Sequence, residues 1–182
     1  MNPHNAYALS KFEAEEGLRK IAFESGIDVV IIRPPLVYGA NAPGNFKTLI
    51  TAVKRGIPLP LGAIKNKRSF VFIGNLVSLV ERCIAHPAAA NQVFLVSDGH
   101  DLSTTELLRE CALAQGVTPR LISIPQKWIE LGAIILGKRE LGVRLCGDLQ
   151  VDISKAKTLL DWMPPYSVAD GLKLTAETAL HS

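Results

Sequence analysis

The chain has 182 residues and a mass of 19.7 kDa, with 48% hydrophobic residues, 20% charged residues and a mean hydropathy of +0.21. This composition excludes a disordered chain, and no stretch reaches the ~20 continuous apolar residues of a membrane span. The net charge is only +3 and the basic residues are dispersed, which argues against nucleic-acid binding and favours a few arginines directed at a small phosphorylated ligand. Three isolated cysteines and four histidines without paired spacing predict no disulfide framework and no metal site, and indicate reduced thiols in a cytoplasmic protein.

Hydrophobic spacing predicts helices and strands that alternate along the chain. A helix is expected over residues 5–24 and ends at Gly26. Residues 27–33 follow as a nearly continuous β-branched strand, buried on both faces and stopped by Pro34. The later elements are a helix over 46–55, a strand over 69–73, a helix over 76–86 capped by Asn75, a strand over 92–96, a helix to Gln115 opened by the capping box of Ser103 and Glu106, an extended segment over 118–124, and helices over 126–136, over 154–160 and from Ser167 onward. This alternation predicts a layered α/β fold.

The common nucleotide-binding loops are absent from the sequence. Neither GxGxxG nor GxxxxGK[ST] occurs among its 14 glycines. The chain also opens almost directly on a helix, although a parallel sheet ordinarily begins with a strand. We therefore expect strands upstream of this helix to be missing.

Tyr7 and Lys11 stand four residues apart and so share one face of the first predicted helix. A phenol with a pKa near 10 is a poor base at neutral pH. A nearby ammonium and the positive end of the helix both favour the phenolate. The pair is therefore a candidate acid–base site for an alcohol that loses a proton while hydride leaves the same carbon.

Five segments, in chain order, share the motifs of one enzyme family. They are the Tyr–Lys segment 5–15, Arg-Pro-Pro-Leu-Val-Tyr-Gly at 33–39, Arg-Ser-Phe-Val-Phe-Ile at 68–73, Asp-Ile-Ser-Lys-Ala at 152–156, and Leu-Asp-Trp-Met-Pro-Pro at 160–165 followed by Gly171 and Leu172. Together they resemble the extended short-chain dehydrogenase/reductase family, in its sugar-nucleotide epimerase/dehydratase branch. The matches extend over essentially the whole chain.

The resemblance implies the C-terminal part of a Rossmann-type doubly wound parallel sheet plus a smaller α/β substrate-binding domain, with the N-terminal dinucleotide-binding strands missing. Residues 1–40 would be a remnant of the NAD-binding domain and 41–182 mainly the substrate domain, with a return of 69–98 to the Rossmann sheet left open. Family members have about 300 residues or more, so the chain is expected to be a fragment of a longer enzyme.

The resemblance also assigns the cofactor side of the site. Tyr7 would be the catalytic base or acid, and Lys11 would lower its pKa and hold the nicotinamide ribose. Pro35, with Pro34 and Val37 beside it, would lie against the nicotinamide. The implied cofactor is NAD rather than NADP, and we expect the isolated chain not to retain it.

The substrate side follows from the same resemblance. Asn45 and Phe46 match positions that touch the sugar nucleotide, and Leu61 would lie along the nucleobase. Arg68 would bind the pyrophosphate, and Arg144 would be a second phosphate or ribose contact. Two arginines suit a pyrophosphate because charge-assisted hydrogen bonds are strong.

The resemblance implies a parent enzyme that is an NAD-dependent 4-epimerase of a UDP-hexose or UDP-N-acetylhexosamine and works through a transient 4-keto sugar. Leu36 replaces an asparagine common in 4-epimerases, which bears on substrate identity. A dehydratase or 4-keto reductase of the same fold is the alternative, and a non-catalytic binding or regulatory protein is the alternative of another class. The chain alone is expected to be inactive. The implied partners are a UDP-sugar and a second copy bound through the Tyr–Lys helix, with neither nucleic acid nor membrane involved.

Overall fold

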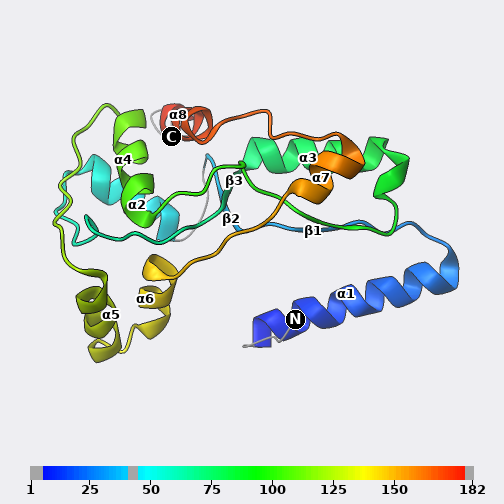
Figure 1. Cartoon of the computed structure of the whole chain (residues 1–182), viewed down its shortest axis with the longest axis horizontal. Coiled ribbons are helices and arrows are strands. Elements are labelled where there is room, and N and C mark those ends of the chain that lie inside the picture. The colour runs from blue at the N-terminus through cyan, green and yellow to red at the C-terminus, as the bar shows by residue number, and fades with distance from the viewer. Residues whose placement is uncertain (1–5, 41–44, 179–182) are drawn as a thin grey trace.

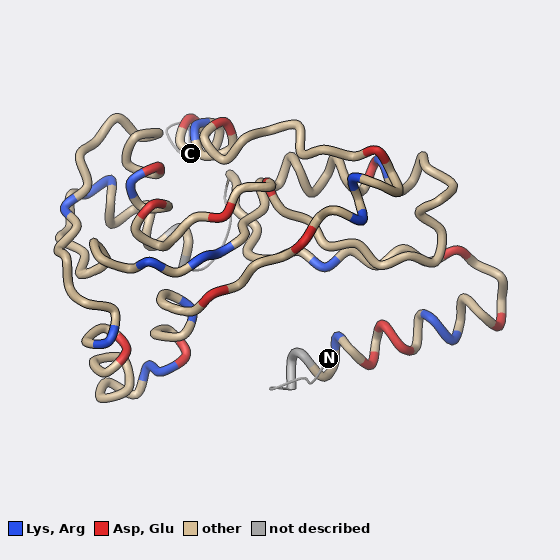
Figure 2. The backbone as a smooth tube through the Cα atoms, in the orientation of Figure 1, with Lys and Arg blue, Asp and Glu red and all other residues tan. Residues whose placement is uncertain are grey.

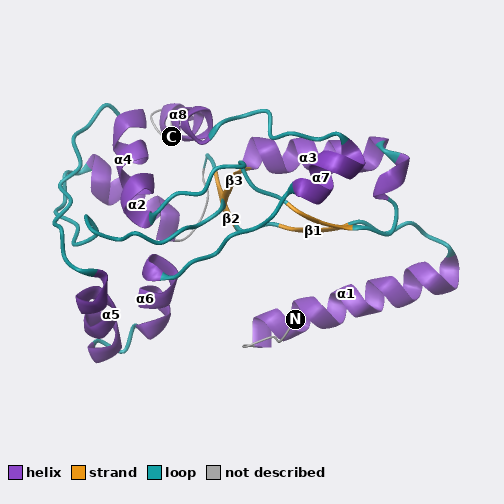
Figure 3. Ribbon diagram, in the orientation of Figure 1, coloured by secondary structure: helices purple, strands orange, loops and turns teal. Residues whose placement is uncertain are grey.

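The computed structural model describes residues 6–40 and 45–178, and within them the side chains of all but residues 6–8, 45 and 47. Eight α-helices and one short 3₁₀-helix accompany four strands in this part of the chain (Figures 1 and 3). The helices are α1 (Ala6–Ser25), α2 (Asn45–Lys54), α3 (Ile73–Ala85), η1 (Pro87–Ala89), α4 (Thr104–Ala114), α5 (Gln126–Ile135), α6 (Arg139–Cys146), α7 (Ser154–Leu160) and α8 (Val168–Thr178). The predicted α/β class is confirmed.

All four strands of the described residues pair in parallel, and they form two separate pairs. The strands are β1 (Ile31–Arg33), β2 (Leu36–Tyr38), β3 (Phe70–Phe72) and β4 (Val93–Leu95). β1 pairs with β4, and β2 pairs with β3. The prediction of one strand over 27–33 is therefore wrong in its extent, because only its last three residues are paired. Pro34 lacks a backbone N–H and ends β1, and the chain then resumes as β2 beside a different partner.

β1 and β4 lie between two helical layers, with α3 and α7 on one side and α1 on the other (Figure 1). Successive side chains around β1 alternate between these layers, as expected of an extended segment. Val29 and Ile31 line a hollow beside α1, whereas Val30 and Ile32 pack against the core that includes α3. All four side chains are half-buried, so the predicted full burial on both faces is not found.

β3 separates the two main cores of the molecule. Its three side chains are at most 7% exposed. Val71 packs in a cluster with α3 and α7, whereas Phe70 and Phe72 pack in a cluster with α4 and α8. A third cluster joins α2 to α4 through Val53 and Leu108. The β2–β3 pair is therefore held from both sides, which fixes the elements around the candidate site.

The helix predicted to follow Asn75 as its cap begins earlier, at Ile73. Phe72 occupies the N-cap position and makes no side-chain capping hydrogen bond. Asn75 lies inside α3, where its amide donates to Asp98 Oδ1 at 2.7 Å and to the Tyr166 carbonyl at 2.9 Å. The predicted cap is wrong because distant partners hold the Asn75 side chain.

The capping box predicted for α4 is confirmed, whereas α6 is missing from the sequence prediction. Ser103 Oγ accepts from the Glu106 N–H at 3.1 Å, and the Ser103 N–H donates to Glu106 Oε2 at 2.8 Å. The short α6 contains Gly142, and glycine disfavours a helix interior. A Cβ at Gly142 would lie 2.9 Å from the Ala133 Cβ, so this glycine lets α6 approach α5 in a helical hairpin (Figure 1).

The packing around Gly171 in α8 leaves no room for a side chain. A Cβ there would lie 2.7 Å from Tyr38 Oη and 2.9 Å from Phe72 Cγ. We expect Gly171→Ala to lower the free energy of unfolding by about 1–3 kcal/mol, the cost typical of an overpacked core. Gly132→Ala in α5 is the matched control, because its Cβ would meet nothing within 4 Å. It should raise stability by roughly 0.5–1 kcal/mol. Urea unfolding followed by circular dichroism measures both, and equal effects would contradict this packing.

Candidate active site

A cavity of about 410 Å³ lies beside the β2–β3 pair. Most of its wall is apolar, and two arginines supply positive charge. Its lining residues are Leu36, Val37, Phe46, Leu49, Arg68, Phe70, Thr104, Leu107, Arg144 and Leu145. They come from β2, α2, the segment leading into β3, α4 and α6. The structure therefore brings together four of the residues singled out in the sequence, namely Val37, Phe46, Arg68 and Arg144.

Arg68 is fixed at the cavity wall by hydrogen bonds. Its backbone N–H donates to the Leu102 carbonyl at 3.0 Å, its own carbonyl accepts from the Leu102 N–H at 3.0 Å, and Nη1 donates to the Gly147 carbonyl at 2.9 Å. Burial lowers the pKa of Arg68, and the charge of Asp148 acts in the opposite direction. Arginine nevertheless stays charged at neutral pH. A partly buried guanidinium in an apolar wall is a strong site for an anion.

Arg144 reaches the same cavity from α6 and is held less firmly. Its Nη2 lies 3.5 Å from Glu140 Oε2, and the two side chains are 64% and 88% exposed. An exposed pair of this kind contributes little to stability, so a phosphate can replace the carboxylate at small cost. The cavity thus has one fixed cation, Arg68, and one cation, Arg144, whose carboxylate partner a phosphate can replace. We call Arg144 the exchangeable cation.

Leu61 lies in the core and does not line the cavity. Its side chain is 4% exposed and packs in the cluster with Val53 and Leu108. Its carbonyl accepts a hydrogen bond from Thr105 Oγ1 at 2.6 Å. The nucleobase contact of Leu61 stays a prediction.

The cofactor-side residues lie on α1, on the link between β1 and β2, and in β2 itself. Tyr7 and Lys11 both belong to α1, which confirms their helical spacing. Lys11 is exposed, whereas the side chains of Tyr7 and Asn45 lie outside the described residues. Pro34 is exposed and Pro35 is half-buried. Pro35 therefore directly precedes Leu36 and Val37, which line the cavity.

A buried polar network behind the cavity has no counterpart in the sequence prediction. Tyr38, at the end of β2, donates to Asp98 Oδ2 at 2.7 Å. Asp98 Oδ1 accepts from the Phe72 N–H at 2.8 Å and from Asn75 Nδ2 at 2.7 Å. Tyr38 and Asn75 are 0% exposed and Asp98 is 7% exposed.

Burial governs the protonation of this network. It raises the pKa of Tyr38 far above the ordinary value, and the Asp98 charge adds to that effect. Burial also raises the pKa of Asp98. The hydrogen bonds that Asp98 accepts from Asn75, Phe72 and Tyr38 act in the opposite direction and lower that pKa. Tyr38 is therefore a protonated donor and not a candidate base. No local pattern marks Asp98, which stands 60 residues from Tyr38 in the chain.

The three thiols are buried, and the acidic groups form no metal-binding cluster in residues 6–40 and 45–178. No group of three or more His, Cys, Asp or Glu side chains there could hold a metal ion. Cys83, Cys111 and Cys146 are free and buried. Burial raises the pKa of Cys111 to about 12, which keeps it an inert thiol. Within the same ranges, no helix has both the length and the apolar content to cross a membrane.

Residues 1–97, more than half of the chain, match the NAD dependent epimerase/dehydratase family, and the chain belongs to that family. It is 49% identical over 181 residues to a UDP-glucose 4-epimerase of Vibrio cholerae, covering 99% of this chain and 55% of that protein. It is 27% identical over 190 residues to the N-acetyl-alpha-D-glucosaminyl-diphospho-ditrans,octacis-undecaprenol 4-epimerase of Escherichia coli O157:H7, covering 97% of this chain and 57% of that protein. The chain thus spans about half the length of the curated relatives it matches.

Solved structures share the fold over the whole chain. The UDP-N-acetylglucosamine 4-epimerase from Bacillus cereus matches with a TM-score of 0.74 and 21% identity, covering 99% of this chain and 55% of that one. The Bordetella bronchiseptica enzyme WbmF, solved with NAD+ and UDP, matches with a TM-score of 0.74 and 22% identity, covering 100% and 55%. These matches confirm the fold that the sequence motifs predict.

Proposed function

We propose that this chain is the substrate-facing part of an NAD-dependent 4-epimerase that acts on a UDP-hexose or UDP-N-acetylhexosamine through a transient 4-keto sugar. The observation that carries the proposal is that Arg68, Arg144, Val37 and Phe46 line the same cavity. The Vibrio cholerae relative, named as a UDP-glucose 4-epimerase, supports the reaction class.

The cavity suits a nucleoside diphosphate. Arg68 and Arg144 supply two cations for the pyrophosphate, and the surrounding wall is mostly apolar. Phe46 is 4% exposed and forms part of that wall, next to Asn45, which we propose as a further contact of the sugar nucleotide. We propose that the nucleobase lies toward the segment that contains Leu61.

The residues at the strand end fit the nicotinamide end of NAD. Val37 and the half-buried Pro35 present apolar surface there, and Lys11 supplies an exposed ammonium on α1 for the ribose hydroxyls. Bound NAD supplies the acceptor and donor of hydride at C4. Tyr7 takes the proton of the C4 hydroxyl as base and later returns it as acid, and Lys11 favours the phenolate. The sequence holds no GxGxxG loop, and we infer that the isolated chain does not retain NAD.

Removing the fixed cation should weaken nucleotide binding more than removing the exchangeable one. We expect Arg68→Met to raise the Kd for UDP by about 10- to 100-fold, the effect of losing a charge-assisted hydrogen bond. Arg144→Met should raise it by only about 2- to 5-fold, since an exposed charge contributes less. Isothermal titration calorimetry measures both, with unfolding curves to show that each variant is folded. Equal affinity losses would contradict the assignment of a fixed and an exchangeable cation.

Turnover tests the proposed reaction. The longest natural protein that contains this chain, given UDP-galactose or UDP-N-acetylgalactosamine, should yield the C4 epimer of at least one, as separated by ion-exchange chromatography. A 4-keto-6-deoxy product would show a dehydratase of the same fold. No conversion of either sugar would refute the epimerase.

The assembly and location belong to the same proposal. α1 exposes large apolar side chains that a second copy could cover, namely Leu9, Leu18, Ile21 and Phe23. We therefore propose a homodimer through α1, to be tested by analytical ultracentrifugation of the parent and of Phe23→Glu. We place the protein in the cytoplasm, where free thiols such as its three cysteines persist.

A further inference from the structure

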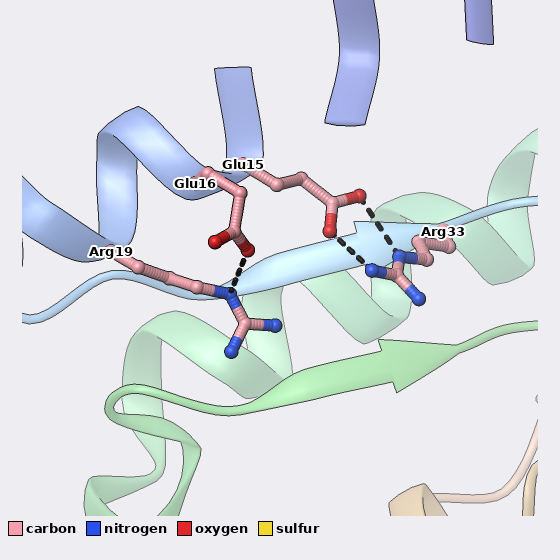
Figure 4. A network of polar contacts seen from close by, with 4 residues as sticks. All are labelled: Glu15, Glu16, Arg19 and Arg33. Carbon is pink, nitrogen blue, oxygen red and sulfur yellow. Dashed lines mark hydrogen bonds and ion pairs between the residues drawn. The ribbon is translucent and has the colours of Figure 1, made fainter. Parts of the chain in front are cut away.

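An ion pair joins the Tyr–Lys helix to the first strand. Arg33 Nε donates to Glu15 Oε1 at 2.9 Å, and Arg33 Nη2 donates to Glu15 Oε2 (Figure 4). The Arg33 and Glu15 side chains are 28% and 18% exposed. Two parallel N–H···O bonds fix both the distance and the relative orientation of the two groups. The contact is therefore a directional link between α1 and β1.

Neighbouring charges on α1 form a different kind of contact. Acidic and basic residues are interspersed along this helix (Figure 2). Glu16 Oε1 and Arg19 Nε lie 3.9 Å apart, and both residues belong to α1 (Figure 4). Their side chains are 60% and 53% exposed. An exposed pair within one helix contributes little and positions nothing else. It provides a matched control for the pair between α1 and β1.

The Glu15–Arg33 pair connects the two parts of the proposed cofactor side. Tyr7, Lys11 and Glu15 follow one another at intervals of four residues, so all three positions lie along one side of α1. Arg33 immediately precedes Pro34 and Pro35. A displacement of α1 along or about its axis would therefore move the acid–base residues relative to the strand end.

The packing between the C-terminal half of α1 and the strands is loose. A hollow of about 270 Å³ lies between the C-terminal half of α1 and the β1–β4 pair, lined by Ala22 and Phe23 on one side and Val29 and Ile31 on the other. Phe23 is 92% exposed. Loose apolar packing does not fix a helix in one orientation, whereas a bidentate pair does.

We propose that Glu15 and Arg33 are positioning residues for the reaction at C4, which hold α1 and its acid–base residues in register with the strand end. This inference rests on the proposed function. Neither residue touches the reacting atoms. The pair acts on catalysis through geometry, and a misplacement of about 1 Å can reduce a rate by about 100-fold.

The variants Glu15→Gln and Glu16→Gln, made in the longest natural protein that contains this chain, test the proposal. Glu15→Gln should reduce kcat for C4 inversion by about 10- to 100-fold. The Kd for UDP should stay within about 2-fold, because Arg68 and Arg144 are unchanged. Glu16→Gln should leave both quantities at the parent values. If the pair had only a structural role, kcat and UDP affinity would instead fall together, in proportion to the fraction of unfolded protein.

A second readout follows the position of α1 directly. Ala14 and Leu113 are exposed, so the substitutions Ala14→Cys and Leu113→Cys provide attachment points for two spin labels. Pulsed electron–electron double resonance between these labels reports the distance from α1 to α4. The distribution should broaden with Glu15→Gln and stay narrow with Glu16→Gln. The double variant Glu15→Arg with Arg33→Glu should narrow it again and restore part of kcat.

The outcomes separate the two claims. An active parent whose kcat changes less than 2-fold with Glu15→Gln, or whose label distribution is unchanged, overturns the positioning role alone. An inactive parent overturns the proposed function, and the catalytic meaning of the pair with it.

Discussion

Asp98→Ala is expected to lower the free energy of unfolding by about 3–5 kcal/mol, because three buried donors lose their hydrogen bonds to its carboxylate, at about 1–3 kcal/mol each. Those donors are the Tyr38 hydroxyl, the Phe72 N–H and the Asn75 amide. They come from β2, β3 and α3, so the loss reaches three elements at once. Asp98→Asn keeps an acceptor oxygen and should cost less. Urea unfolding followed by tryptophan fluorescence and by circular dichroism gives the values.

Asp28→Ala is the control for this prediction. Asp28 is exposed and accepts one hydrogen bond, from Asn91 Nδ2 at 2.9 Å. Its loss should cost no more than about 0.5 kcal/mol, as for most surface substitutions. If Asp98→Ala costs as little as Asp28→Ala, the network does not hold β2, β3 and α3 together.

Tyr7→Phe is expected to lower kcat for C4 inversion by about 100- to 10,000-fold, the range of general acid–base catalysis. The change removes the group proposed to take and return the proton and leaves the ring in place. KM for the UDP-sugar should change little, because the pyrophosphate contacts are on Arg68 and Arg144. Steady-state kinetics of the longest natural protein containing the chain measures both constants.

Tyr166→Phe is the matched control for Tyr7→Phe. Tyr166 is 39% exposed, and its ring packs edge-on against Phe72 with centroids 5.4 Å apart. Removing its hydroxyl should leave kcat within about 2-fold of the parent, as for other surface changes away from a site. A comparable loss in both variants would contradict the role of Tyr7 as the acid–base residue.

The features predicted correctly are those whose signals are local in the sequence. The capping box of Ser103 and Glu106 lies within four residues and identifies the start of α4. The spacing of Tyr7 and Lys11 likewise requires only one helix, and α1 supplies it. The motif around Arg68 led to a residue that the structure places in the cavity with Arg144.

The features that were missed or wrong depend on distant parts of the chain. Asn75 is a good N-cap by local preference, but Asp98 and Tyr166 hold its amide inside α3. β2 becomes a strand only because β3 lies beside it, and the preceding prolines hide it from a local reading. Leu61 packs between α2 and α4, a placement that its turn-rich segment does not reveal, and its nucleobase contact stays a prediction.

Proton NMR of the turnover of UDP-galactose and of UDP-N-acetylgalactosamine in D2O tests the central claim most directly. The longest natural protein that contains this chain should convert at least one of them to its C4 epimer, with no deuterium bound to any sugar carbon. That result requires hydrogen to leave C4 and return to it without exchange with water, while Tyr7 handles only the hydroxyl proton. Deuterium at a sugar carbon, a 4-keto-6-deoxy product, or unchanged UDP-galactose and UDP-N-acetylgalactosamine would contradict the epimerase.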